Sequence, residues 1–164
     1  MSKVLSRSIF ASAALVVGAC STLAPGALQP GASIAEARAT FGGSTGEYPL
    51  SGGGTRLEFA RGSFGKQTYM LDFDAAGRLV ESHQVLTEAN FATIVPDLPA
   101  AEVRMRLGRP ANVFYVPWQK IQVWNYRYQP ADCVWYQVSI GDAGRVTEAG
   151  YGTDPACDGP STRD

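Results

Sequence analysis

The sequence has little of the chemistry that catalysis or metal binding needs. His83 is the only histidine, which excludes a histidine-based metal cluster, and its place in a predicted strand favours a solvent-facing residue. No G-x-S-x-G motif is present, so a serine hydrolase is not expected. Asp72 and Asp74 would share a strand face, but no base accompanies them; a polar strand end and a turn residue are the simpler interpretation. We therefore expect a protein that is not an enzyme and has no cofactor or metal.

Charge is also scarce. The chain has 14 Lys and Arg against 15 Asp and Glu, without a cluster of basic residues. Because binding to phosphates needs a concentrated positive surface, nucleic acid is not an expected partner. The run Gly52-Gly53-Gly54 is followed by neither Lys-Ser nor Lys-Thr, so it indicates a flexible turn and no phosphate site.

No apolar run has the length of a transmembrane helix. The apolar and small-residue run near the N-terminus, Ile9 to Gly18, carries no charge and is about half of the roughly 20 residues that a span requires. Lys3 and Arg7 precede it, as in a secretory signal peptide. The segment Leu15 to Cys20 resembles a bacterial lipobox. This predicts a lipoprotein signal peptide over residues 1–19 and a lipid-modified, diacylglycerol- and palmitate-bearing Cys20.

Cysteines are few, and the lipobox assigns one of the three. Cys133 and Cys157 remain, and in an oxidising periplasm two spare cysteines are most simply a disulfide. Residues 20–31 are rich in Ala, Pro, Gly and Ser and predict a tether, and residues 159–164 predict a flexible tail. By resemblance to bacterial lipoproteins, Ser21 after the lipidated cysteine favours the outer membrane.

The remaining sequence contains an internal repeat. Cys133 to Ala149 repeats the strand, Gly-containing turn and strand of Thr68 to Ser82, 67 positions earlier. We expect a loop at 42–54, helices at 33–41, 87–94 and 99–107, and strands at 55–60, 66–73, 78–86, 113–118, 123–129, 133–140 and 145–151.

Several segments of the second copy form the pattern of a lipoprotein family. They are Leu86 to Phe91, Ala101 to Val103 with Leu107 to Pro110, Trp124 to Tyr126, and Val138 to Ile140 with Gly144 to Val146. The pattern resembles the SmpA/OmlA (BamE-like) outer-membrane lipoprotein domain. The resemblance implies an α+β fold of two BamE-like repeats, residues 32–86 and 87–158, with short helices packed on antiparallel β-sheet meanders. Tandem copies are also similar in architecture to the β-lactamase inhibitor protein.

Aromatic residues are concentrated in the second copy. Strict alternation along strands prevents all of them from facing one core. One interpretation is a sheet packed with large side chains; the other is an exposed binding face, because Tyr and Trp supply contact area at low entropy cost. We favour a core position for Tyr126 and Tyr128, since the aligned residues of the first copy are also apolar. The predicted partner-binding residues are then Phe114, Tyr115, Trp118 and Trp135.

These observations favour a non-enzymatic outer-membrane lipoprotein. It would act as a binding or scaffolding module at the periplasmic face, with its lipid anchor in the membrane and a protein partner. By the resemblance, that partner belongs to envelope or β-barrel protein assembly. The alternative is an inhibitor or regulator that binds a periplasmic enzyme through the sheet face.

Overall fold

The computed structural model describes residues 28–62, 65–129 and 131–157, which form two four-stranded antiparallel sheets. The strand orders are β1-β2-β3-β4 and β5-β6-β7-β8, so each sheet is a simple meander. The helices are α1 (Ile34–Phe41), α2 (Glu88–Phe91) and α3 (Ala100–Leu107), with a 3-10 turn at Pro155–Cys157. The strands are β1 (Gly46–Pro49), β2 (Thr55–Arg61), β3 (Gln67–Phe73), β4 (Leu79–Gln84), β5 (Asn112–Val116), β6 (Ile121–Arg127), β7 (Val134–Gly141) and β8 (Val146–Thr153).

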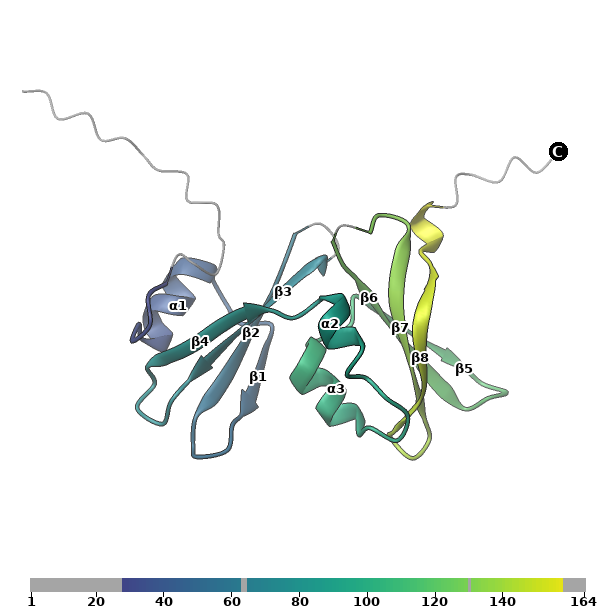
Figure 1. The fold of residues 1–164 in the computed structure, drawn as a ribbon, viewed down its shortest axis with the longest axis horizontal. Coiled ribbons are helices and arrows are strands. Elements are labelled where there is room, and N and C mark those ends of the chain that lie inside the picture. Colours follow the sequence, from purple (N-terminus) through teal and green to yellow (C-terminus); the bar gives the residue numbers. More distant parts are fainter. Residues whose placement is uncertain (1–27, 63–64, 130, 158–164) are drawn as a thin grey trace, which may run out of the picture.

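The elements form alternating layers (Figure 1). Helix α1 covers one face of the first sheet, and α2 and α3 lie between the first sheet and the second. The outer face of the second sheet, away from α2 and α3, has no described helix upon it. The two sheets therefore differ in how far the described helices cover their faces.

Helix α1 begins at a complete capping box. The Ser33 hydroxyl accepts a hydrogen bond from Glu36 N, and the Glu36 carboxylate accepts from Ser33 N at 2.7 Å. Gly42 ends the helix with a φ of +81°, a conformation that costs glycine little. Ala37 and Phe41 are buried against the apolar residues of β2 and β3. The first sheet and α1 therefore have a core of their own.

Helices α2 and α3 form a second core with the second sheet. Phe91 of α2 stacks on the ring of Tyr136, with 4.3 Å between centroids. Tyr136 donates a hydrogen bond to Phe91 O, and Tyr126 donates to Gly108 O at the end of α3. The rest of this core includes Val103 and Leu107 of α3, Trp124, Tyr128, Val138 and Ile140 of the sheet, and Met70 of β3. The core position predicted for Tyr126 and Tyr128 is confirmed.

The internal repeat is visible in the backbone. In the first half, Ser33, just before α1, forms an isolated antiparallel bridge with Arg78, and in the second half Pro99, just before α3, does the same with Arg145. Each half also has an irregular register between its third and fourth strands. The same connections thus recur about 66 residues apart, as the sequence pattern predicted.

The predicted α+β fold of two BamE-like repeats is wrong. Strand makes up 44% and helix 18% of the structure, so the protein is β-rich with a few short helices. The expected helix at 87–94 is reduced to the four residues of α2, because the hydroxyl and N–H of Thr93 both donate to Asn90 O and end it. The expected loop at 42–54 contains β1. The other expected elements lie within two residues of the observed ones.

The predicted signal peptide, the lipid-modified Cys20 and most of the predicted tether lie outside the described residues, as does the tail at 159–164. Among the helices of the described ranges, none has the length and apolar character needed to cross a membrane.

Candidate protein-binding surface

The two faces of the second sheet differ in chemistry because side chains alternate along each strand. On β6, Trp124 and Tyr126 point to the helices and are buried. Val123, Asn125 and Arg127 occupy the alternate positions, on the outer face. The outer face therefore combines a few apolar residues with polar ones, whereas the inner face is aromatic.

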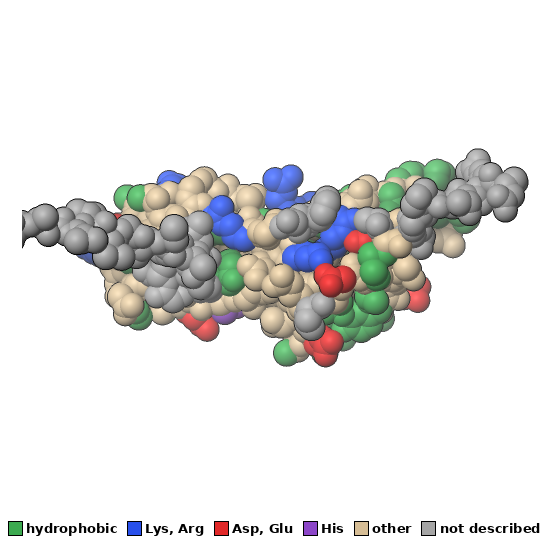
Figure 2. Space-filling model, turned by 90° about the horizontal axis from the view of Figure 1, so that it is seen from above, with side chains coloured by type: hydrophobic (Ala, Val, Ile, Leu, Met, Phe, Trp, Pro, Cys, Tyr) green, Lys and Arg blue, Asp and Glu red, His purple; other side chains and the backbone are tan. Residues whose placement is uncertain are grey.

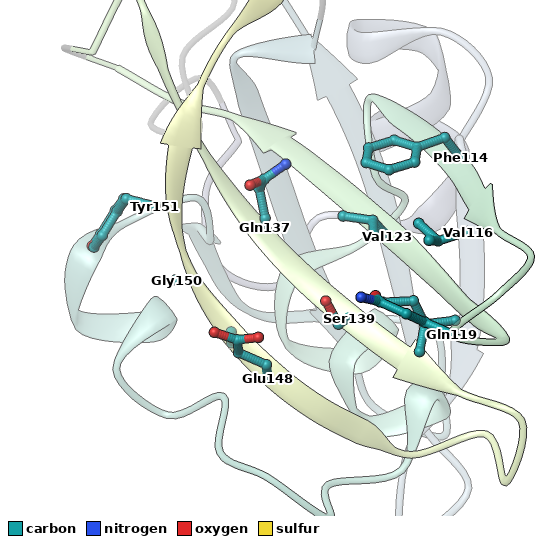
Figure 3. A pocket seen from close by; sticks show the side chains of 11 residues that line it. Phe114, Val116, Gln119, Val123, Gln137, Ser139, Glu148, Gly150 and Tyr151 are labelled. Atoms are coloured by element: carbon teal, nitrogen blue, oxygen red, sulfur yellow. The ribbon is translucent and has the colours of Figure 1, made fainter.

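A shallow hollow of about 270 Å³ lies on this outer face (Figure 3). Apolar side chains from β5 and β6 form one side of it, and Gln137 and Ser139 of β7 lie opposite. Tyr151 points away from the hollow, toward the Phe91 and Tyr136 rings on the inner side. The other lining residues are Phe114, Val116, Gln119, Ile121, Val123, Glu148, Ala149 and Gly150.

Strand β5 is the most exposed strand of the second sheet. Phe114 is 43% exposed and Tyr115 is 54% exposed, although they point to opposite faces. Val113 is exposed as well, and Trp118, in the turn that follows, is 83% exposed. Three of the four predicted partner-binding residues, Phe114, Tyr115 and Trp118, therefore lie together in an accessible hairpin.

A second hollow, of about 280 Å³, lies on the other side of β5. It is lined by Tyr115, Lys120 and Gln122 of the β5–β6 hairpin and by residues of the β7–β8 hairpin, including Asp142. Trp124 also lines it, and the Arg104 guanidinium lies 4.6 Å from the centroid of the Trp124 ring. Strand β5 is thus flanked by a hollow on each of its faces, and both hollows have polar and apolar residues in their lining.

Trp135, the fourth predicted partner-binding residue, is only 6% exposed. It lies on the outer face of β7, where the Arg127 guanidinium covers its ring at 5.3 Å. Arg127 is held by a two-point ion pair with Asp154, and this hydrogen bonding raises the pKa of Arg127. The Trp135 side chain is therefore not accessible as a contact surface.

The predicted disulfide between Cys133 and Cys157 is present, with Cα atoms 5.5 Å apart. It joins the segment before β7 to the 3-10 turn after β8. Asp154 N also donates a hydrogen bond to Cys133 O at 3.0 Å. One end of the second sheet is therefore fastened covalently, at the end where Trp135 is covered.

Polar residues also gather where the two halves meet. Glu58 of β2 is fully buried and accepts hydrogen bonds from Thr45 Oγ1, the Tyr48 hydroxyl and Arg109 N. Burial, followed by the hydrogen bond to Glu58, raises the pKa of Tyr48. Figure 2, viewed from above, shows Lys and Arg side chains over this middle region and hydrophobic side chains over the end formed by the second sheet. We interpret the junction as a structural joint.

The two aspartates and the histidine considered from the sequence have roles in the fold or lie at the surface. Asp72 forms a two-point ion pair with Arg56, with distances of 2.6 Å. Asp74 accepts from two backbone N–H groups of its own turn, as predicted for a turn residue. His83 of β4 is partly exposed. Over the described ranges, no three His, Cys, Asp or Glu side chains are grouped so that they could hold a metal ion.

Sequence reasoning missed the polar side of the outer hollow. Gln137 and Ser139 alternate with Tyr136 and Val138 on a single strand. That alternation was a usable signal, because a strand with one apolar face turns its intervening residues to the other side. The position of Glu148 beside them depends on the pairing register of β7 with β8, which the sequence does not specify.

Comparisons with known proteins do not identify a family for the chain. No family model matches it, and no curated protein matches it. Among solved structures it is similar to a cysteine-rich secretory protein from Staphylococcus aureus, with 15% identity and a TM-score of 0.30 over 77% of this chain. It is also similar to a DUF4309 family protein from Bacillus subtilis, with 12% identity and a TM-score of 0.30 over 75% of this chain. The match spans 45% of the first protein and 79% of the second. Neither is described as a SmpA/OmlA protein.

Proposed function

We propose that the chain is a non-enzymatic binding module that holds a protein partner on the β5 hairpin and the outer face of the second sheet. The observation behind this proposal is the combination of a sheet face that none of the described helices covers with exposed Phe114, Tyr115 and Trp118 at its edge. Adjoining exposed apolar residues of this kind commonly mark interaction sites on soluble proteins. Tyr and Trp are also the residues that contribute most to binding energy at protein interfaces.

We further propose that the module works at the periplasmic face of the outer membrane, held there by lipid on Cys20. The lipobox-like segment before Cys20 is the support for this part. More than one acyl chain is needed for stable attachment, because a single chain binds only marginally. Cys20→Ser is expected to leave the precursor unprocessed and unlipidated. Normal processing and membrane retention of this variant would contradict the anchor.

A photocrosslinking experiment tests the binding surface. A photoreactive amino acid replaces Tyr115 in one strain and Val80 in another, each in the full-length protein. Val80 is the matched control, since it is 62% exposed and lies on an edge strand of the first sheet. We expect one discrete crosslinked species from position 115 and none from position 80. Equal crosslinking from both positions, or none from 115, would contradict the proposal.

The identity of the crosslinked protein separates two roles. A subunit of the envelope or barrel-assembly machinery supports scaffolding, which the sequence resemblance favours. A soluble periplasmic enzyme supports the role of inhibitor or regulator, and that enzyme should then lose activity when the purified module is added. Tyr115→Ala should relieve this inhibition, because it removes an exposed contact side chain.

A further inference from the structure

The free edges of the two sheets are blocked to different extents. Strand β1 has only four residues and ends at Pro49, so it offers little for another strand to pair with. Strand β4 is occupied at its start by the segment before α1: Gly31 N donates to Leu79 O, and Leu79 N donates to Ala32 O, both at 2.8 Å. Both edges of the first sheet are therefore protected.

The second sheet has one protected edge and one open edge. The start of β8 is paired with the segment before α3, since Asp97 N donates to Val146 O and Val146 N donates to Leu98 O. Strand β8 also carries Glu148, and charge on an edge strand disfavours further pairing. On the other edge, no strand of the described ranges pairs with the side of β5 that faces away from β6.

Strand β5 has neither the backbone pairing with a preceding segment that protects β4 and β8 nor a charged or proline residue within it. Its sequence, Asn112 to Val116, has no charge, no proline and no glycine. Alternate residues of an antiparallel edge strand direct backbone N–H and C=O groups away from their only neighbour, and these groups are available to another strand. Pro110 and Pro117 stand just outside β5, so they restrict such pairing to about five residues.

The surroundings of β5 define the chemistry of a strand that would pair with it. On the outer face, a new strand would lie beside the apolar side chains of Phe114 and Val116, at the rim of the first hollow. On the opposite face it would lie beside the Tyr115 hydroxyl group and the Lys120 ammonium group, at the rim of the second hollow. No ion pair within the described ranges involves Lys120. A complementary strand is therefore apolar on one side and polar or acidic on the other.

We propose that an extended segment of the partner protein, about five residues long and amphipathic, joins the second sheet as a further strand beside β5. Backbone hydrogen bonds would supply affinity, and the side chains next to the two hollows would supply specificity. This inference rests on the proposed function and specifies how the partner is held.

A second copy of this chain fits the edge less well. Two copies joined at this edge would place β5 of one beside β5 of the other. A copy of β5 would present apolar side chains on both of its faces, since Val113 and Tyr115 alternate with Phe114 and Val116. It would place no acidic side chain beside Lys120.

The test uses the full mature protein and a phage-displayed library of random ten-residue peptides. The strongest selected peptide is synthesised in two N-methylated forms, each methylated at one set of alternate residues. Methylation removes a backbone donor, so the register that faces β5 should lose roughly tenfold or more in affinity, and the other register about twofold at most. Peptide binding should slow amide hydrogen exchange at residues 112–116.

A charge variant provides an independent readout. Lys120→Glu should weaken an acidic selected peptide by about tenfold, while Arg78→Glu, directly before β4 of the first sheet, should leave it unchanged. Equal tolerance of both methylated registers, or selection that yields no peptide protecting residues 112–116, would overturn strand addition.

Other results distinguish this inference from the proposed function. If position 115 crosslinks to a partner in cells while the peptides show no register dependence, the binding surface stands and strand addition fails. If position 115 crosslinks to no protein, both fail. A dimer in sedimentation analysis, crosslinked between two copies of position 115, would overturn the inference in favour of a second copy.

Discussion

At the residue scale, Glu58 shows how a polar group is accommodated in a buried position. Its carboxyl oxygens accept three hydrogen bonds, two from side chains of the β1 region and one from Arg109 N in the second half. A buried donor that loses its acceptor costs about 1–3 kcal/mol. Glu58 therefore stabilises the joint between the halves, although it lies in the middle of a strand.

Glu58→Gln is expected to lower the free energy of unfolding by about 2–3 kcal/mol, because the amide NH₂ cannot accept from all three donors. Urea unfolding of the two proteins measures the difference. Glu81→Gln is the matched control, since Glu81 is exposed on β4 and should change stability by less than about 0.5 kcal/mol. A Glu58→Gln protein as stable as the control would contradict this account.

Tyr136 makes stability depend on pH in the alkaline range. Burial, with a smaller contribution from Tyr151, raises the pKa of Tyr136 to about 12. An unfolded tyrosine loses its proton near pH 10. Between about pH 10 and 12 the folded state therefore binds more protons, and the free energy of unfolding falls as pH rises, by up to about 1.4 kcal/mol per pH unit for one such group.

Tyr136→Phe should make the free energy of unfolding fall less steeply between about pH 10 and 12, because the contribution of this one tyrosine is removed. At neutral pH the variant should be somewhat less stable, because the hydrogen bond to Phe91 O is lost. Guanidinium unfolding at pH 8, 9, 10 and 11 gives both quantities. Parallel curves for the two proteins above pH 10 would show that Tyr136 ionises equally in both states.

At the element scale, two tryptophans of the same region have opposite surroundings. Trp124 on β6 is buried against α3, and Trp118 in the preceding turn is 83% exposed. Trp124→Ala is expected to cost about 3–5 kcal/mol of stability, whereas Trp118→Ala should cost less than about 0.5 kcal/mol. Thermal unfolding monitored by circular dichroism measures both. Similar losses for the two variants would show that the turn is packed in solution.

The disulfide fastens the segment after β8 to the start of β7. Its cysteines are 24 residues apart, and in the chain-entropy model closing such a loop contributes about 3–4 kcal/mol. The double variant Cys133→Ser, Cys157→Ser should lose about this much stability, and dithiothreitol should bring the natural protein to the same unfolding midpoint. If the reductant leaves the midpoint unchanged, the bond does not restrain the unfolded chain.

The sequence predicts most elements because their signals are local. The capping box at Ser33, the glycine after each eight-residue helix and the alternation of Trp124 with Val123 act within a few residues. The errors arose where tertiary contacts decide. Strand β1 forms in a glycine-rich segment because it pairs with β2, and Trp135 is buried because Arg127 folds over it. The sequence could not predict which face of the second sheet the described helices leave open, because the packing of α2 and α3 between the two sheets depends on contacts between the halves.

At the scale of the whole molecule, the glycines that end α1 and α3 occupy equivalent positions, but only the second one lies at the joint between the halves. Gly42 after α1 and Gly108 after α3 have nearly the same φ, +81° and +78°. A Cβ on Gly42 would meet no atom within 4 Å, whereas a Cβ on Gly108 would lie 2.9 Å from the Glu58 carboxyl group. The two glycines therefore have the same backbone conformation. They differ in whether neighbouring atoms leave room for a Cβ.

Gly42→Ala should cost about 1–3 kcal/mol, because its φ of +81° and ψ of −160° lie in a region that is almost restricted to glycine. Gly108→Ala should cost about 1–3 kcal/mol more, because it also displaces Glu58 from its hydrogen bonds. Chemical unfolding of the two single variants, measured side by side, gives the difference. Equal losses of stability in the two variants would show that Glu58 can move aside without a loss of free energy.

Helix α3 packs in an apolar cluster to which both halves of the chain contribute. Met70 of the first sheet shares one apolar cluster with Val103 of α3 and with the aromatic residues of the second sheet. Detaching either half would expose that cluster to water, so neither half is a free-standing unit. The two halves should therefore melt in one cooperative transition, and the duplicated arrangement persists as a single folding unit in which neither copy can be lost without the other.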